Sequence, residues 1–477
     1  MTSADRGTSR RTFVTTAAAV TAGGSIMAIM SDLAGGITRA EAKASTPTHD
    51  EQYLVDDVRT TTDNGVEIIV PPLYKYIITG KLRSDRKWDA KALKQAQAKL
   101  EKALAQAEKG RPRTAAGLTV VVAWGLPYFE TYIKPLVSTA TWDAVWPRTG
   151  GESAVIPARK FASDPATVVL EDNHVMVMIR SDSPIILDDV KGKLFHDSAA
   201  EGYLGDIIQV TSERMGFVGR GFDKPSVAKQ LAIKAGVANA QDIPDNAQLM
   251  MGYTSTQKAA LPPDNISSFE TLGLTTVKPG DYFAGGAAVH LSHMYEHLDR
   301  WYAKPASERA HRMFSPRTEI ADKTVTVPNG PADVSSLDQV KADAVKDPGG
   351  HTSLLQQVTR LKGDVTDAYS VVRRAGTAVP AREDFNTLDA PFMTVTDAKG
   401  KASNPRQNRP GLHFVVFVPR SQSFHAARDA MDGILPGGVT LGTATGNGIN
   451  DVLETTHRQN FLAPPRSHRS FPMADLL

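Results

Sequence analysis

Residues 175–184 read Val-Met-Val-Met-Ile-Arg-Ser-Asp-Ser-Pro, and this stretch decides the fold. Its first five residues are apolar and partly β-branched, which is typical of a strand buried on at least one face. Ser181, Asp182 or Ser183 can cap a helix, and Pro184 stands where a first-turn proline is tolerated. The stretch therefore predicts a strand that leads directly into a helix.

The same strand-then-helix pattern occurs three more times. The predicted pairs are 118–123 with 128–133, 287–291 with a helix near 297–301, and 412–418 with 424–431. Each strand is short and apolar, and long connections separate the pairs. Four such units predict two α+β halves, each with a sheet that carries helices on one face.

Other segments flank these units. Residues 45–115 contain a predicted strand at 66–70 and an amphipathic helix from Trp88 to Glu108, and we interpret them as an N-terminal extension. Residues 302–350 are polar and contain several prolines, which predicts a long surface connection. The tail 436–477 is rich in glycine and arginine, and we expect it to wrap around the body.

The N-terminus carries the pattern of a twin-arginine export signal. In residues 9–14, Ser-Arg-Arg-Thr-Phe-Val, two arginines precede an uncharged run that extends to Met30. Small-residue cleavage sites follow at residues 40–42 and 42–44. A membrane anchor is the alternative, but the run is short and rich in Thr, Ser and Gly. Residues 1–44 thus predict a signal peptide, the twin-arginine translocase as partner, and a secreted or periplasmic location.

Composition excludes several classes of protein. The chain has 54 Lys and Arg against 52 Asp and Glu, a net charge of +2, which indicates neither nucleic-acid binding nor a stable polybasic membrane anchor. The absence of cysteine excludes disulfides, iron–sulfur clusters and thiolate haem ligation. Because the twin-arginine route carries folded proteins, the signal favours a cofactor, and in a chain without cysteine a metal or haem must be held by His, Asp, Glu, Tyr or Met.

The order of these segments resembles that of the dye-decolourising (DyP-type) haem peroxidases. The resemblance is carried by residues 175–182, by 247–253, which are similar to the family's GEFLLGY segment, by 285–301, and by 411–424. It runs discontinuously from about residue 116 to 433. It implies an α+β fold of two ferredoxin-like halves, antiparallel sheets with peripheral helices, in the dimeric α/β-barrel-like superfamily. The halves are expected at residues 116–275 and 276–435.

The resemblance also implies a haem b site in the second half. Arg373 stands in Val-Val-Arg-Arg-Ala-Gly and looks like the distal arginine of the family's LRRG segment. His351 lies 22 residues upstream, where the family has the histidine that ligates the iron. The family's HIRRANPR continuation is replaced here by residues 352–355, Thr-Ser-Leu-Leu. A helix-capping or surface role is the alternative for His351.

The acid–base group of the family is altered in this chain. The family's GFxDG motif resembles residues 216–225, in which Gly219 fills the aspartate position. Asp223 is the nearest replacement, and Arg373 acting alone is a second alternative. The resemblance implies oxidation of a small organic donor by hydrogen peroxide, and it allows a homo-oligomer. The alternative function is a degenerate, haem-free binding protein on the same fold.

Two further patterns suggest ligand binding. Residues 293–297, His-Met-Tyr-Glu-His, match the H-x-x-E-H zinc pattern, which requires a helix. The alternation before them instead predicts a strand with His290 and His293 on opposite faces, and a non-catalytic metal site is the remaining alternative. The basic tail from His457 to Pro472 could bind an anionic group, or its Phe461 and Phe471 could simply anchor it in surface pockets.

Overall fold

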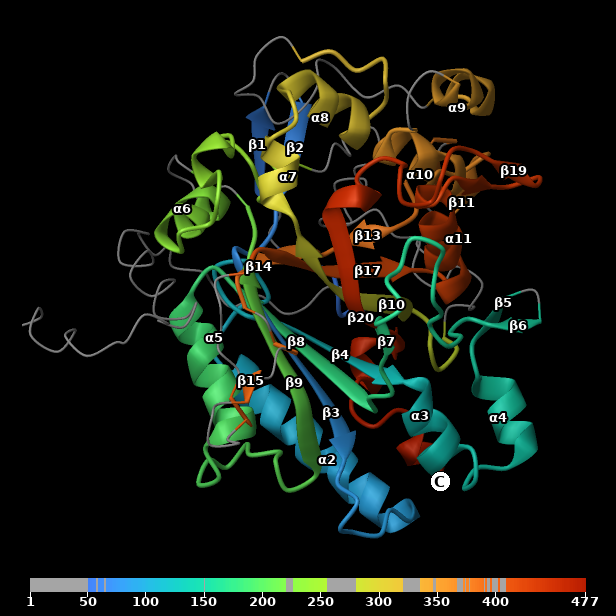
Figure 1. Ribbon diagram of the computed structural model, residues 1–477. Helices are drawn as coiled ribbons and strands as arrows, with labels where there is room; N and C mark the ends of the chain where they lie inside the picture. Colours follow the sequence, from blue (N-terminus) through green and yellow to red (C-terminus); the bar gives the residue numbers. More distant parts are fainter. Residues whose placement is uncertain are drawn as a thin grey trace, which may run out of the picture.

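The computed structural model describes residues 50–477 except 57–58, 64–65, 150, 220–225, 255–279, 321–334, 346–348, 367–371, 374, 377, 390, 393–394, 397–401 and 404–408. Figure 1 shows the arrangement of its helices and strands. Within these residues no helix combines the length and the apolar character needed to cross a bilayer. The predicted signal peptide, residues 1–44, lies outside the described residues.

The first half is a four-stranded antiparallel sheet with two helices. Its elements, in chain order, are β3 (Tyr74–Leu82), α2 (Ala90–Glu108), β4 (Thr119–Gly125), β8 (Val175–Ser181), α5 (Pro184–Lys191) and β9 (Ile208–Phe217). The strands lie in the order β9-β3-β8-β4, which is the ferredoxin-like arrangement of a β-α-β-β-α-β unit. Figure 1 shows α2 and α5 beside these strands.

The second half repeats this arrangement. Its strands are β10 (Ala287–Glu296), β14 (Phe385–Thr387), β17 (Gly411–Val418) and β20 (Leu453–Ala463), in the order β20-β10-β17-β14. Helices α7 (Leu298–Tyr302), α8 (Ala306–Met313), α9 (Leu337–Ala344) and α10 (His351–Thr359) lie between β10 and β14 in the chain, and α11 (Ser421–Met431) follows β17. The prediction that residues 302–350 form only a long surface connection was wrong, because α8 and α9 form within this segment.

The two sheets join edge to edge. β9 pairs with β14 at Phe217 and Asn386, and β4 pairs with β20 through Trp124 and Leu462. Since β10 pairs with both β17 and β20, the eight strands form a closed ring without a free edge. The predicted fold class is therefore confirmed: two ferredoxin-like halves form one α/β barrel.

Residues of the extension and of the tail complete this barrel. β3 and α2 come from residues 45–115, and β20 comes from residues 436–477. The expected domain boundaries at 116 and 435 therefore do not follow the strand pairing. The polar strands β3 and β20 are held in the sheet by their neighbours, and the buried leucines of α2 pack against the first sheet.

Shorter elements surround the barrel. They are β1 (Arg59–Asp63), β2 (Val66–Val70), α3 (Leu126–Tyr128), α4 (Thr139–Val145), β5 (Arg148–Thr149), β6 (Glu152–Ser153), β7 (Val169–Leu170), α6 (Val227–Lys234), β11 (Val365–Thr366), β12 (Val372–Arg373), β13 (Ala381–Arg382), β15 (Val395–Thr396), β16 (Ala402–Ser403), β18 (Ile434–Leu435) and β19 (Val439–Thr440). Of these, β7 pairs with β20 and β13 pairs with β17, so both extend the main sheet.

The barrel interior combines apolar side chains with a buried ion cluster. Ile77, Met178 and Phe417 belong to the interior apolar cluster, which follows the two-residue period of the strands. Lys75 Nζ lies 2.5 Å from one Glu383 oxygen, and Arg180 Nη1 lies 2.9 Å from the other. All three side chains are at most 1% exposed. The helices and a larger apolar core lie outside the ring, and the outer layer of the second half contains a cavity.

Candidate functional site

A cavity of about 200 Å³ lies between the outer face of the second sheet and helices α8, α10 and α11. The sheet contributes outward-facing residues of β10, β17 and β20, among them Met294, Glu296 and Phe414. The helices contribute Met313, His351, Phe424 and Arg428, among others. The cavity is thus mostly apolar with several charged groups, which is the usual composition of a small-molecule site.

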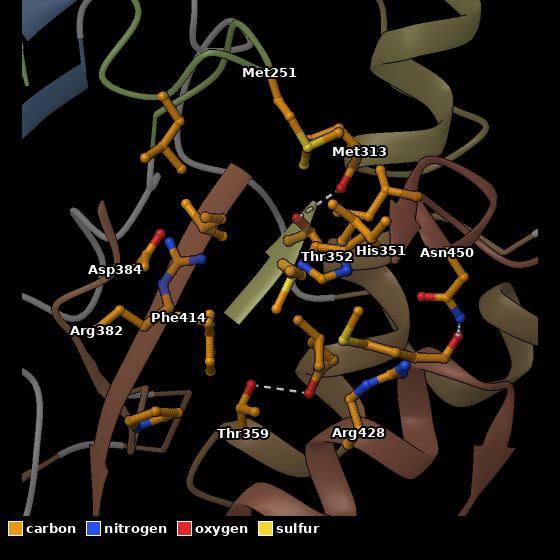
Figure 2. A pocket seen from close by; sticks show the side chains of 18 of the residues that line it. Met251, Met313, His351, Thr352, Thr359, Arg382, Asp384, Phe414, Arg428 and Asn450 are labelled. Atoms are coloured by element: carbon orange, nitrogen blue, oxygen red, sulfur yellow. Dashed lines mark hydrogen bonds between the residues drawn. The ribbon is translucent and has the colours of Figure 1, made fainter. Parts of the chain in front are cut away.

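His351 begins α10 and faces the cavity (Figure 2). Its position depends on glycines, because a Cβ on Gly350 would lie 2.4 Å from the Phe314 carbonyl oxygen. A Cβ on Gly448 would likewise lie 3.0 Å from the His351 backbone, and Gly448 has φ +49°. Among the described residues the imidazole has no hydrogen-bond partner. Burial, with Arg382 and Arg428 nearby, lowers the pKa of His351 to about 3, so the ring is neutral.

Arg382 lines another side of the cavity, together with Asp384 (Figure 2). The Arg382 Nε atom is buried and has no hydrogen-bond partner within the described chain. Arg373 instead lies in β12, which among the described strands pairs with β11 and stands apart from the main sheet. The side chain of Arg373 is outside the described residues, so its distal role stays a prediction. The arginines that the structure brings to the cavity are Arg360, Arg382, Arg428 and Arg458.

The predicted acid–base residue Asp223 also lies outside the described residues. The glycine before it has a structural explanation. Gly219 has φ +92°, a conformation that favours glycine, and a Cβ there would lie 3.2 Å from Leu73. An aspartate at position 219 would therefore be strained.

Glu296 is a cavity residue that the sequence did not identify as such. It ends β10, its side chain is nearly fully buried, and both carboxylate oxygens lack hydrogen-bond partners among the described residues. Burial, with a contribution from Asp384, raises the pKa of Glu296 to about 8. The group therefore holds a proton at neutral pH. The H-x-x-E-H pattern includes Glu296, but that pattern implies zinc chemistry and not a place in this cavity.

The zinc-hydrolase pattern is not realised. Residues 293–296 belong to strand β10, whereas the motif requires a helix. His290 stacks on Phe424 outside the sheet, with ring centroids 3.4 Å apart. His293 contacts its cross-strand neighbour His413 of β17 on the inner face of the sheet, with ring centroids 5.0 Å apart. The predicted opposite orientation of His290 and His293 is confirmed. No cluster of three or more metal-binding side chains occurs in the described part of the chain.

The tail is anchored by its aromatic residues. Phe471 is fully buried and contacts Trp124 at a centroid distance of 4.7 Å, and Phe461 lies inside β20. Arg469 has carboxylate partners on α2, Glu101 at 2.8 Å and Glu108 at 2.7 Å. These contacts favour the anchoring alternative over an anion site in the tail.

Comparison with solved structures identifies the fold. A dye-decolorizing peroxidase (DyP) from Bacteroides thetaiotaomicron matches with a TM-score of 0.51 and 10% identity, over 89% of this chain and 98% of that chain. A DyP-type peroxidase from Cellulomonas bogoriensis matches with a TM-score of 0.51 and 15% identity, over 90% and 96% of the two chains. At such identities the likeness establishes the fold and not the activity.

Sequence comparison gives the family. No curated protein matches the chain. One family model does match, over residues 81–465. This range covers most of both halves of the barrel, including the last strand, β20. The chain therefore belongs to the family described as Family of unknown function (DUF7405).

Proposed function

We propose that this chain is an exported haem protein that oxidises a small organic donor with hydrogen peroxide, and that His351 ligates the iron. The observation that carries the proposal is the neutral His351 imidazole, which faces the cavity with both nitrogens unpaired among the described residues. A neutral imidazole is the form that ligates haem iron. The DyP-type fold supports the same assignment at the level of architecture.

The residues that line the cavity fit haem in chemical character, but the cavity is smaller than a usual ligand site. Ligand sites usually measure roughly 300–1,000 Å³, and this cavity measures about 200 Å³. Its walls include Met251, Met294, Met313 and Met431, whose unbranched side chains adapt readily. We therefore propose that these methionines move aside when haem enters.

The residues around the cavity can each take a defined role. Haem supplies the redox chemistry when it is bound. Arg382 lines the cavity, its Nε–H has no partner among the described residues, and it can stabilise negative charge that develops on peroxide. Glu296 holds a proton on its carboxyl group at pH 7 and can exchange it with a peroxide oxygen. Arg373 and Asp223 stay predictions for these two roles.

The cavity volume favours a second candidate, a haem-free protein that binds a small organic molecule. A cavity of about 150 Å³ accommodates benzene, so about 200 Å³ is sufficient for a substituted ring without any movement of the walls. In this alternative His351 is a polar contact in the site and carries no iron.

Spectroscopy of the full chain separates the two candidates. The proposal predicts a Soret band in protein expressed with a haem supply, loss of the band in His351→Ala, and peroxide-dependent oxidation of an organic dye. His196→Ala is the matched control, because His196 is exposed and pairs with Glu213 in the first half. Protein that stays colourless with excess haem would overturn the haem proposal.

Export is a separate part of the proposal and has its own test. It rests on the paired arginines of residues 9–14. A fusion of residues 1–44 to a reporter that functions only outside the cytoplasm should be exported, and replacing Arg10 and Arg11 by lysine should stop export. Unchanged export of the lysine variant would refute the twin-arginine route.

A further inference from the structure

Two buried arginines meet at one end of the cavity. Arg428 of α11 and Arg458 of β20 both line it, with side chains 10% and 1% exposed. Arg428 Nη1 lies 2.8 Å from Asp432, and Arg458 Nη2 lies 2.5 Å from Asp164. These two aspartates are not among the described lining residues. Both arginines thus line the cavity, and each is held by an aspartate that does not line it.

Arg458 has hydrogen-bond donors without a partner among the described residues. Its Nε and Nη1 atoms are buried and have no hydrogen-bond partner in the part of the chain that the structure describes. Burial lowers the pKa of Arg458 to about 10, which still leaves the guanidinium charged at pH 7. Buried donors of a charged group are normally paired, because leaving them unpaired costs stability. These two N–H groups therefore point to a ligand that accepts hydrogen bonds.

The charge of the lining indicates an anionic ligand. Four arginines line the cavity, at positions 360, 382, 428 and 458, against two acidic residues, Glu296 and Asp384. Burial raises the pKa of Glu296 to about 8, so this carboxyl adds no negative charge at pH 7. Asp432 and Asp164 balance the charges of Arg428 and Arg458 from outside the cavity, so the surplus of positive charge along the walls comes from Arg360 and Arg382 against Asp384.

The rest of the site indicates an apolar body on that anion. Met294, Leu412, Phe414 and Phe424 line the cavity on β10, β17 and α11, the elements that adjoin the arginines. A volume of about 200 Å³ accommodates a single substituted aromatic ring. Planar guanidinium groups match carboxylates in geometry and in charge.

We propose that Arg458 binds the carboxylate of an apolar organic acid in this cavity. The carboxylate can belong to a free acid or to a propionate group of haem, and only this second source rests on the proposed function. The inference about the free acid holds whether or not haem binds.

Calorimetric titration of the haem-free full chain at pH 7 tests the proposal without any substitution. Benzoate and benzamide have nearly the same shape, but only benzoate carries the negative charge. We expect benzoate to bind at least about tenfold more tightly than benzamide, because a charged hydrogen bond is lost in the amide. Equal binding of the two probes, or no binding of either, would overturn the proposal.

A double variant tests the residue itself. Arg458→Leu with Asp164→Leu removes the donors without leaving a buried carboxylate unpaired, and it should abolish the preference for benzoate. The matched control is Arg159→Leu with Asp429→Leu, an exposed pair with a distance of 2.6 Å, which should leave the preference unchanged. If the first double variant does not fold, the comparison of benzoate with benzamide on the native chain still decides.

Haem loading separates the two sources of the carboxylate. If a propionate occupies Arg458, haem should prevent benzoate binding, and the double variant should bind haem at least about tenfold more weakly. If the ligand is a free acid, the double variant should lose the preference for benzoate and still bind haem as tightly as the native chain. A chain that binds benzoate selectively but never binds haem would refute the proposed function and leave this inference standing.

Discussion

Replacing Glu296 by glutamine should stabilise the protein. Glutamine has nearly the same shape, is always neutral and needs no proton to remain buried. The native carboxyl group has its pKa raised from 4.5 to about 8 by burial, with a contribution from Asp384. A group with a raised pKa in the folded state contributes its full stability below the unfolded value, and that stability is lost as the pH rises toward the folded value.

The magnitude follows from the same two values. Between pH 4.5 and pH 7 the folded chain retains a proton at Glu296 that the unfolded chain releases. Each pH unit of that interval costs about 1.4 kcal/mol. The variant should therefore be more stable than the native chain by about 3 kcal/mol at pH 7, and the gain should disappear near pH 4.5.

Urea unfolding of both proteins at several pH values measures this difference. Glu130→Gln is the matched control, because Glu130 is exposed and its replacement should change the free energy of unfolding by no more than about 0.5 kcal/mol at any pH. A gain that does not grow between pH 4.5 and pH 8 would show that Glu296 is ionised in the folded protein. The cavity would then lack the proton donor that the proposed function assigns to it.

Three further predictions concern buried side chains of the barrel interior and of the tail. Glu383→Gln leaves two buried cations without their shared partner and should cost about 3–5 kcal/mol in urea unfolding, whereas Asp172→Asn breaks only an exposed pair and should cost less than about 1 kcal/mol. Burial, with His293 and Arg214 nearby, holds the pKa of His413 far below 6.5. The free energy of unfolding should therefore fall as the pH drops below 6.5, by about 1.4 kcal/mol per unit for this histidine, and His413→Phe should remove that share. Phe471→Ala empties a fully buried site against Trp124 and should lower the free energy of unfolding by about 3–5 kcal/mol, and a smaller change would mean that the tail is not an anchor.

The sequence predicted the apolar strands and missed the polar ones. β8 and β17 carry nearly continuous apolar residues, β10 begins with a short apolar run, and each was located from that pattern. β9 and β20 carry charged and polar residues as well as apolar ones. Some of these charged side chains form ion pairs with residues outside the two strands. Arg214 of β9 bonds to Glu171, and Arg458 of β20 bonds to Asp164. Such partners come from distant parts of the chain, so the hydropathy pattern alone does not reveal these strands.

The candidate site was predicted in part. His351 was located by its spacing from Arg373, and the structure places it at the cavity. Arg382 and Glu296 carry no sequence signal for this role, because it depends on buried atoms that lack partners after the sheet has closed. Their identification required the folded arrangement of β10, β13 and α10.

Titration of the haem-free chain with haem tests the central claim most directly. Absorbance in the Soret region should rise until one haem is bound per chain and then level off. His351→Ala should lose this saturable signal, and added imidazole should restore it by replacing the missing ligand. A native chain that gives only the linear signal of free haem, or a His351→Ala variant that titrates like the native chain, would contradict the account.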